Sequence, residues 1–457
     1  MADLTGIDVE HARALHEAEN ARFVAERPAS MALLERARAS MPRGVPMSWM
    51  DDLYEHPPVW VSHGKGARLT DLDEHSYLDM YIADMSAFCG HAPDQVVDAV
   101  ARQMERGIQF LLPSEDAIAV AEHLAGRYGP PQWQFTLSAT QANTEVIRLA
   151  REMTGREVVL LFDGKYHGEG DATLVVLENG RVAPEMRGLP GSISGQARIV
   201  QFNDLGSLAA ALEPRDVALV LAEPAMTNAG LLMPEDGFHE ELRRLTRDAG
   251  TLLAIDETHS LVCAHGGLTR AWGLESDFLV LGKSIAAGVP LGAYGMSAEI
   301  GALIAPPEHS RVVSGVAIGE VATGGTLFAN ALSMAAARVA LLDVLTEGAF
   351  QRTAALGRRM AVGLREAIER AGLQWSVAQA GGHAYYFFEP VPPRDGASSR
   401  LADDPDLRAL IRVFMANRGV WESGWWLGPT VSVAHTEADV DRYLELFGEF
   451  VAEVTRG

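Results

Sequence analysis

The chain has 457 residues, of which 48% are apolar and 22% charged, a composition typical of a soluble globular protein. Its formal net charge of −23 disfavours nucleic acids and anionic membranes as partners, because the surface would repel a polyanion. The two cysteines, Cys89 and Cys263, lie far apart without CxxC spacing, so we expect no disulfide framework and no metal site. No signal-peptide pattern and no long apolar run occurs, which predicts a cytoplasmic protein.

The predicted elements change in kind along the chain. Residues 8–40 are rich in Ala, Arg and Glu and predict one or two helices, and alternating apolar residues around 64–66 predict a hairpin. From about 94 to 330, short apolar runs alternate with amphipathic helices, which predicts an α/β fold with a mostly parallel sheet covered on both faces. A long helix, a strand pair around 381–390 and a terminal helix follow, as in a smaller α+β domain.

These patterns divide the chain into three segments. We expect residues 66–330 to form a large domain and residues 331–457 a small α+β domain. Residues 1–65 would be an N-terminal segment that joins the small domain. Turn-forming residues in 390–406 predict a flexible loop there.

Two apolar runs each end in a residue able to do chemistry. One run ends in Asp256, and the next ends in Gly282-Lys283. In a parallel sheet both side chains would lie at the carboxyl ends of strands, where ligands bind. Pyridoxal phosphate (PLP) needs this pair, because the lysine forms the Schiff base and the aspartate keeps the pyridine nitrogen protonated. The alternative is a strand-end Asp and an unrelated surface Lys.

The segment Ser138-Ala139-Thr140-Gln141 lies between a predicted strand and a predicted helix. Free backbone N–H groups at a helix start favour a phosphate, although a plain Ser/Thr helix cap would give the same pattern. In DGKYHGEG, Tyr166 is placed to cover a planar ring, and its alternative is a core tyrosine.

Two later segments also carry polar groups beside predicted strands or helices. Asn228 in LAEPAMTNAG is placed to donate to a phenolate oxygen, or else is a turn asparagine. Gly325 and Thr326 in TGGTLFAN offer an N–H and a hydroxyl to a phosphate, or else form a turn before the next helix.

Together these five motifs resemble the class III (subgroup II) aminotransferases of PLP fold type I. The similarity is greatest to the branch of glutamate-1-semialdehyde aminomutase-like enzymes and β-amino-acid transaminases, and it runs from GVPMSWM (44–50) to SVAHTEADVDRY (432–443). It implies a large domain with a mostly parallel seven-stranded sheet and a smaller α+β domain. It also implies a homodimer with shared active sites that acts on a small amine or amino acid and a carbonyl acceptor.

The resemblance assigns roles to individual residues. Lys283 and Asp256 would be catalytic, with Lys283 in the Schiff base and Asp256 at the pyridine nitrogen. Tyr166 and Thr258 would cover the two ring faces, and Asn228 would bind the 3-hydroxyl group. The implied cofactor contacts are Ser138, Ala139, Thr140, Tyr166, His167, Asn228, Asp256, Thr258, Lys283, Gly325 and Thr326, the last reaching the phosphate of the other subunit.

The chain departs from the family pattern near the cofactor. Ala139 and Gln141 stand where the motif usually has Gly and Glu. His259 stands where an apolar residue is more common, and it would either move protons beside the substrate or support the site through hydrogen bonds.

The substrate pocket departs further. No arginine follows Val45 to clamp a substrate carboxylate, so glutamate semialdehyde is not the expected substrate. An aromatic-lined pocket is the alternative, with substrate contacts from Trp49, Phe88, His259 and Trp425, although tryptophans are also common in cores. Glu422 would hold a cationic group or be a solvated loop carboxylate.

The predicted function is that of a PLP-dependent aminotransferase with a ping-pong mechanism. It would move an amino group from an amine or amino acid, β- and ω-amino substrates included, to a keto acid or aldehyde. The alternative is a PLP-dependent aminomutase or ammonia-lyase acting on an amino-aldehyde or 1-hydroxy-2-amino substrate. A cofactor-binding sensor is disfavoured because the chain has no basic stretch, and a dehydrogenase because no G-x-G-x-x-G follows a strand.

Overall fold

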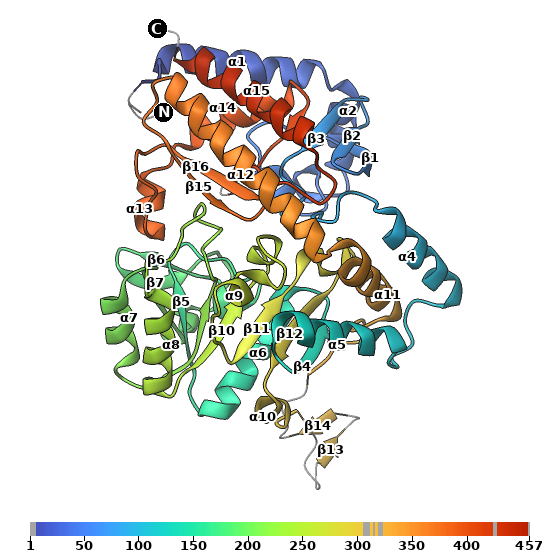
Figure 1. Ribbon diagram of the computed structural model, residues 1–457, viewed down its shortest axis with the longest axis vertical. Coiled ribbons are helices and arrows are strands. Elements are labelled where there is room, and N and C mark those ends of the chain that lie inside the picture. The colour runs from blue at the N-terminus through green and yellow to red at the C-terminus, as the bar shows by residue number, and fades with distance from the viewer. Residues whose placement is uncertain (1–5, 305–310, 314–315, 319–322, 424–426, 456–457) are drawn as a thin grey trace. The chain divides into compact units, whose positions relative to one another are not determined.

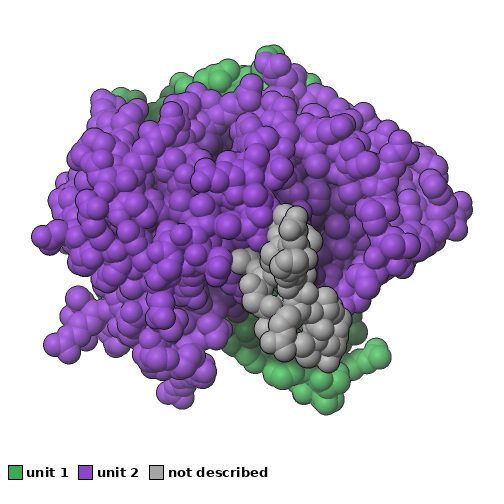
Figure 2. All heavy atoms as spheres, turned by 90° about the horizontal axis from the view of Figure 1, so that it is seen from below, with its two compact units in different colours: residues 1–93, 349–393, 399–457 green, residues 94–348, 394–398 purple. Residues whose placement is uncertain are grey.

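The computed structural model describes residues 6–304, 311–313, 316–318, 323–423 and 427–455 (Figure 1). The chain folds as two compact units, which Figure 2 shows in different colours. Unit 1 comprises Met1–Pro93, Ala349–Pro393 and Ser399–Gly457, and unit 2 comprises Asp94–Gly348 and Arg394–Ser398.

Unit 2 is built on one sheet of seven strands within the described residues. β12 runs antiparallel to its two neighbours, and all other pairs are parallel. The mostly parallel seven-stranded sheet predicted for the large domain is therefore confirmed. In spatial order the strands are β4 (Gln132–Thr136), β12 (Gly292–Met296), β11 (Phe278–Leu281), β10 (Leu252–Asp256), β9 (Val217–Ala222), β5 (Val158–Phe162) and β8 (Ala197–Val200).

Helices cover both faces of this sheet because side chains alternate along each buried strand. Leu161 of β5 belongs to the core cluster shared with Val146 of α6 (Ala139–Thr154). The next residue, Phe162, points to the other face and packs against Phe238 of α8 (Phe238–Ala249), with ring centroids 5.9 Å apart. Burying one such side chain contributes about 1.5–3 kcal/mol, so this two-sided core holds the strand ends in place.

Figure 1 labels the remaining elements of unit 2. α11 packs against α4 and α5, and α7 packs against α8. These helices are α4 (Asp94–Arg106), α5 (Glu115–Tyr128), α7 (Leu205–Leu212), α9 (Gly267–Ala271), α10 (Ala298–Gly301) and α11 (Ala331–Val339), and the two hairpins are β6 (Val175–Glu178) with β7 (Arg181–Pro184) and β13 (Arg311–Val313) with β14 (Val316–Ile318).

Unit 1 has an α+β fold with its own apolar core. Side chains from α12, α14 and α15 fill this core, including Phe414 and Phe450, whose ring centroids are 5.3 Å apart. Its strands are β1 (Val61–Lys65), β2 (Arg68–Asp71), β3 (Ser76–Asp79) and β17 (Val420–Trp421) in one sheet and β15 (Ser376–Ala380) and β16 (His383–Phe387) in a hairpin, and its helices are α1 (Val9–Ala25), α2 (Pro28–Ala37), α3 (Trp49–Asp52), α12 (Glu347–Arg370, from residue 349), α14 (Pro405–Ala416) and α15 (Glu437–Val454).

The units divide at residues 93 and 348, whereas the sequence pattern predicted boundaries at 65 and 330. β3 pairs with β17 from the end of the chain, which places residues 66–93 in unit 1. α11 packs against α4 and α5, which places residues 331–348 in unit 2. Hydrophobic periodicity marks elements but not their partners, so it does not reveal either grouping.

The prediction of a flexible loop over residues 390–406 is wrong for the central part of that segment. α13 (Gly396–Leu401) begins there, and Arg394 exchanges two hydrogen bonds with Asn203. A β-carbon on Gly396 would lie 2.2 Å from the carbonyl oxygen of Asp163, so the backbones are in close contact. Turn-forming residues indicate irregular backbone, and here that backbone is packed.

Candidate active site

Asp256 ends β10 and is buried. Its Oδ2 accepts hydrogen bonds from Asn143 Nδ2 at 2.8 Å and His167 Nδ1 at 2.9 Å, and its Oδ1 accepts from the backbone N–H of Thr258 at 3.0 Å. Burial alone would raise the pKa of Asp256, but these donors outweigh it and hold the pKa at about 2. Asp256 is therefore an anion at neutral pH.

The two side chains that hold Asp256 come from separate elements. Asn143 lies on α6, and His167 lies in the segment after β5. Asn143 Nδ2 also donates to the carbonyl oxygen of His167 at 3.1 Å, so the three residues form one network. Asn143 was not predicted, although it lies two positions after the segment Ser138-Ala139-Thr140-Gln141. Its signal is spacing, because a residue four positions after Ala139 lies on the same helix face.

Lys283 follows β11, the parallel neighbour of β10. Asp256 lies opposite Val280 in this pairing, so Lys283 emerges just beyond the same edge of the sheet. Its backbone has φ 53°, in the left-handed region, which costs roughly 1–2 kcal/mol for a residue with a β-carbon. Such strain is typical of functional sites, where the surrounding structure imposes it. Lys283 Nζ lies 2.5 Å from His259 Nε2.

The predicted phosphate-binding segment forms the first turn of α6. Ser138 makes no capping hydrogen bond, and its hydroxyl donates to Gln141 Oε1 at 3.3 Å instead. The plain helix cap considered as an alternative is therefore absent from the described residues at this helix start. The backbone of Gly168 lies against this first turn, since a β-carbon on Gly168 would be 2.1 Å from Thr140 Oγ1. Gly168 also has φ +90°, which glycine alone adopts readily.

Gly282, the residue before Lys283, lies in close contact with two of the segments described above. A β-carbon on Gly282 would lie 2.9 Å from the β-carbon of Ala139 and 3.4 Å from Cγ2 of Thr258. The residue before Lys283 therefore touches both the start of α6 and the segment after Asp256. Thr258 Oγ1 is buried and has no hydrogen-bond partner among the described residues.

A second hydrogen-bond network lies after β9. Thr227 Oγ1 lies 2.6 Å from Glu223 Oε2 and 2.7 Å from His259 Nδ1, and Asn228 Nδ2 lies 3.5 Å from the same ring nitrogen. Asn228 and His259 were predicted, and the structure places them side by side. Glu223 and Thr227 were not predicted, although Glu223 directly follows a fully buried strand.

Other predicted cofactor residues lie at the margin of these networks. Tyr166 is half-buried, and its hydroxyl donates to Glu169 Oε1 at 3.3 Å. Gly325 and Thr326 are exposed, and the side-chain amide of Gln109 donates to the Thr326 carbonyl oxygen. In the part of the chain that the structure describes, no hydrogen bond joins Thr326 to Thr140.

The aromatic substrate contacts predicted outside this cluster belong to unit 1 or lie outside the described residues. Phe88 is fully buried and packs against Phe350, with ring centroids 5.3 Å apart. Trp49 is partly exposed on α3. Trp425 lies outside the described residues. The pocket roles of all three stay predictions.

The expectation that Glu422 is a solvated loop carboxylate is wrong. Glu422 is only 2% exposed, and its Oε1 accepts hydrogen bonds from the hydroxyls of Tyr386 and Tyr443, both at 2.9 Å. Burial raises the pKa of Glu422 to about 7, against the opposing effect of the two hydroxyls. A loop position in the sequence does not reveal that α15 and β16 enclose this side chain.

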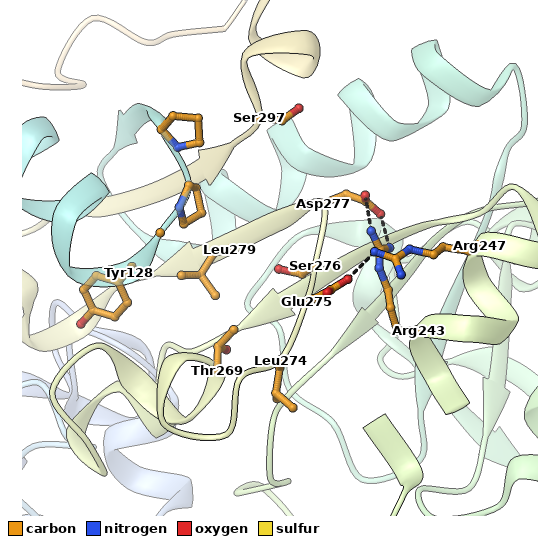
Figure 3. A pocket seen from close by; sticks show the side chains of 13 residues that line it. Tyr128, Arg243, Arg247, Thr269, Leu274, Glu275, Ser276, Asp277, Leu279 and Ser297 are labelled. Carbon is orange, nitrogen blue, oxygen red and sulfur yellow. Dashed lines mark hydrogen bonds and ion pairs between the residues drawn. The ribbon is translucent and has the colours of Figure 1, made fainter. Parts of the chain in front are cut away.

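Unit 2 has a pocket of about 370 Å³ whose lining includes none of the predicted site residues. Figure 3 shows the side chains that line it. It lies at the amino end of β11, whereas Lys283 follows the carboxyl end. Its Arg243 donates two hydrogen bonds to Asp277 at 2.8 and 2.9 Å, and Arg247 pairs with Glu275. Both arginines are thus already paired with carboxylates of the chain.

Two kinds of feature are absent from the described part of the chain. No three His, Cys, Asp or Glu side chains in it are grouped closely enough to hold a metal ion. None of its helices is both long and apolar enough to cross a membrane.

The family model "Aminotransferase class-III" matches residues 50–381. The chain belongs to the class-III aminotransferases. The predicted family, PLP fold type I and enzyme class are thereby confirmed, and PLP is the cofactor of this family.

Similar proteins cover this class-III aminotransferase almost from end to end. A glutamate-1-semialdehyde 2,1-aminomutase 2 from Halalkalibacterium halodurans is 35% identical over 428 residues, covering 90% of this chain and 95% of that protein. A glutamate-1-semialdehyde aminomutase structure from Pseudomonas aeruginosa PAO1, in complex with PMP, has 37% identity and a TM-score of 0.92, and the match covers 98% of this chain and 100% of that one. A β-phenylalanine aminotransferase from Variovorax paradoxus has 26% identity and a TM-score of 0.86, covering 96% and 97%.

Proposed function

We propose that this protein is a PLP-dependent aminomutase, which moves an amino group between two carbons of one small substrate. The observation that carries the proposal is the joint position of Asp256 and Lys283 at one sheet edge, in a chain whose aminomutase relatives match it over nearly its whole length. Transfer between two molecules, which the sequence pattern favoured, becomes the second candidate.

Asp256 fits the pyridine nitrogen of PLP. A carboxylate offers about four lone-pair positions, and three of those on Asp256 are used by the donors described above. One acceptor position is left for the ring N–H. PLP bound in this way withdraws electrons from the bonds next to the substrate nitrogen. An ionised Asp256 keeps the ring nitrogen protonated, and Asn143 and His167 keep Asp256 ionised and oriented.

The start of α6 fits the phosphate. The helix has 16 residues and no side-chain cap, so its first N–H groups and its positive dipole end are available to an anion. We assign this role to Ser138, Ala139 and Thr140. The alanine that replaces the usual glycine still supplies its N–H, and its methyl group packs against Gly282.

Lys283 is the residue to which we assign the covalent bond with PLP. With PLP bound, the amine of Lys283 would be the group placed to take up and return the proton of the reacting carbon. Tyr166, Thr258 and Asn228 would contact the ring, as in the family pattern.

We also propose a homodimer, with Thr326 reaching the phosphate of the second copy. The segment between α4 and α5 exposes three consecutive apolar side chains, Phe110, Leu111 and Leu112, with exposed fractions of 51%, 71% and 71%. Such a patch favours burial against a partner surface. Gln109 of the same segment holds the backbone of Thr326, which links this face to the phosphate-binding residue. Sedimentation of the wild type should give the dimer mass, and Leu111→Asp should shift it to the monomer.

A labelled substrate tests the reaction. The PLP-loaded protein is incubated with ¹⁵N-labelled amino aldehydes and no separate carbonyl acceptor, and products are followed by NMR. An aminomutase converts substrate to its isomer over many turnovers and retains the label. A product limited to about one turnover per site would contradict the proposal and favour transfer between two molecules.

One observation favours that second candidate. Arg43, which directly precedes the segment GVPMSWM (44–50), forms ion pairs with Asp51 and Asp52, so its guanidinium group is already engaged. The chain thus lacks a carboxylate clamp at this point, and we infer a substrate other than glutamate semialdehyde. A panel of amines without carboxyl groups, tested with a keto-acid acceptor, identifies such a transaminase by its carbonyl product.

A further inference from the structure

A continuous line of hydrogen bonds leads from a buried carboxylate to the amine of Lys283. Glu223 Oε2 lies 2.6 Å from Thr227 Oγ1, which lies 2.7 Å from His259 Nδ1. The other ring nitrogen, His259 Nε2, lies 2.5 Å from Lys283 Nζ. Glu223, Thr227 and His259 are all buried, so bulk water does not compete at these steps.

The hydroxyl of Thr227 sets the direction of this line. An ionised Glu223 can only accept, and its Oε2 already accepts the backbone N–H of Thr227 at 3.1 Å. The single hydroxyl hydrogen of Thr227 therefore points to Glu223, and the hydroxyl oxygen accepts from His259 Nδ1–H. In this tautomer His259 Nε2 carries a lone pair, and that lone pair faces the amine of Lys283.

We propose that Glu223, Thr227 and His259 form a proton relay that removes a proton from the ammonium group of Lys283 and later returns it. An N–H bond breaks at Lys283 Nζ and one forms at His259 Nε2, while His259 Nδ1–H passes to Thr227 Oγ1. The hydroxyl hydrogen of Thr227 passes to Glu223 Oε2. One proton moves in total, and the ammonium–carboxylate pair becomes a neutral amine and a neutral acid.

The electrostatics around Glu223 support a proton at its end of the relay. Burial raises the pKa of Glu223 to about 8, and the negative charge of Asp256 adds to this effect, while the hydrogen bonds from Thr227 oppose it. Asp256 itself stays ionised because His167 faces it. With a pKa of about 8, Glu223 changes between its ionised and its protonated form near neutral pH. The ionised form can take the proton that leaves Lys283, and the protonated form can return it, whereas Asp256 stays ionised.

The relay matters because only a neutral amine can form or exchange a Schiff base. An ordinary lysine, with a pKa near 10.4, is neutral in only about one molecule in a thousand at pH 7.4. The inference rests on Lys283 as the reacting amine of the proposed function. It adds His259 as a group that acts directly on that amine, and Glu223 and Thr227 as residues that position and charge it.

The composition of the chain allows a direct test, because it contains three lysines, Lys65, Lys165 and Lys283. The full-length protein, with PLP removed by dialysis against an amine, is treated with acetic anhydride between pH 6 and 11. Peptide mass spectrometry then gives the acetylation rate of Lys283 relative to that of exposed Lys65. Circular dichroism confirms that each sample remains folded.

Three variants interrupt the relay at different points: His259→Gln, Thr227→Val and Glu223→Gln. We expect each to lower the acetylation rate of Lys283 at pH 7 by roughly tenfold, because without the relay the amine keeps its proton and does not react. The difference from the wild type should disappear near pH 11, where lysine is neutral without help. Thr246→Val is the matched control, because its buried hydroxyl donates to the Arg243 carbonyl oxygen at 2.9 Å, away from the relay. It should leave the rate unchanged.

A purely structural role for these residues gives a different result. The variants would then lose thermal stability but keep the wild-type pH profile of Lys283, which would overturn the relay. Free imidazole should restore the rate of His259→Ala only if the ring moves protons. Failure of the proposed function is separately visible, because borohydride reduction of the PLP-loaded protein would then leave Lys283 unlabelled.

Discussion

His167 Nδ1 donates to Asp256 Oδ2 at 2.9 Å, and both side chains are buried. The ionised carboxylate can only accept, so the hydrogen of the ring must lie on Nδ1. This fixes the orientation of Asp256 at the edge of the sheet and keeps it charged. Several expected properties of the protein depend on that charge.

Replacing Asp256 with Asn should slow removal of the substrate's amino group by two orders of magnitude or more. An amide cannot hold the pyridine nitrogen of PLP protonated, and loss of such electrostatic stabilisation costs on the order of 10²–10³ in rate. Stopped-flow absorbance after mixing with substrate measures the step. A rate near that of the wild type would remove Asp256 from this role.

Acid should weaken the fold in a specific pH range. Asp256 has its pKa lowered from its ordinary value of 3.8 to about 2, so its contribution is complete above pH 4 and is lost as the pH falls through 2. A shift of this size corresponds to about 2 kcal/mol. Urea unfolding of the wild type and Asp256→Asn should therefore show a stability difference that shrinks between pH 4 and 2. A difference independent of pH would contradict the assignment.

Gly168→Ala should weaken PLP binding and lower stability by roughly 1–3 kcal/mol. The new β-carbon would lie 2.1 Å from Thr140 Oγ1, so the first turn of α6 would have to move. Gly180→Ala is a matched control, because Gly180 also has a left-handed backbone, with φ +74°, but has nothing within 4 Å. PLP titration and thermal melting compare the two. Equal losses would show that backbone strain alone is responsible.

Lys283→Ala should abolish turnover and the yellow absorbance of lysine-bound PLP, while PLP still binds through its phosphate and ring. Lys165→Ala is the control, since Lys165 Nζ donates to the Val175 carbonyl oxygen and to Glu185, outside the network of Asp256. Absorbance spectra and borohydride labelling follow both variants. Turnover by Lys283→Ala at the normal rate would show that another group reacts with PLP.

The sequence by itself determined the sheet of unit 2 and the residues that end its strands. Apolar runs such as Val217–Ala222 must be buried on both faces, and helices between them require parallel strands. Asp256, Lys283 and the start of α6 could be selected because the carboxyl ends of parallel strands meet at one edge. That inference needs only the period of the pattern and the handedness of the connections.

Only the tertiary structure decided which side chains form hydrogen bonds with the site residues. Asn143 and His167 hold Asp256, and Thr227 reaches His259, across separations of 32 to 113 residues. The burial of Glu422 and the boundary between the two units depend in the same way on contacts distant in sequence. The periodicity of a sequence shows which face of a segment is apolar. A hydrogen bond between two side chains, however, requires their donor–acceptor distance to be correct to within a few tenths of an ångström, and that distance is set only when the elements pack together.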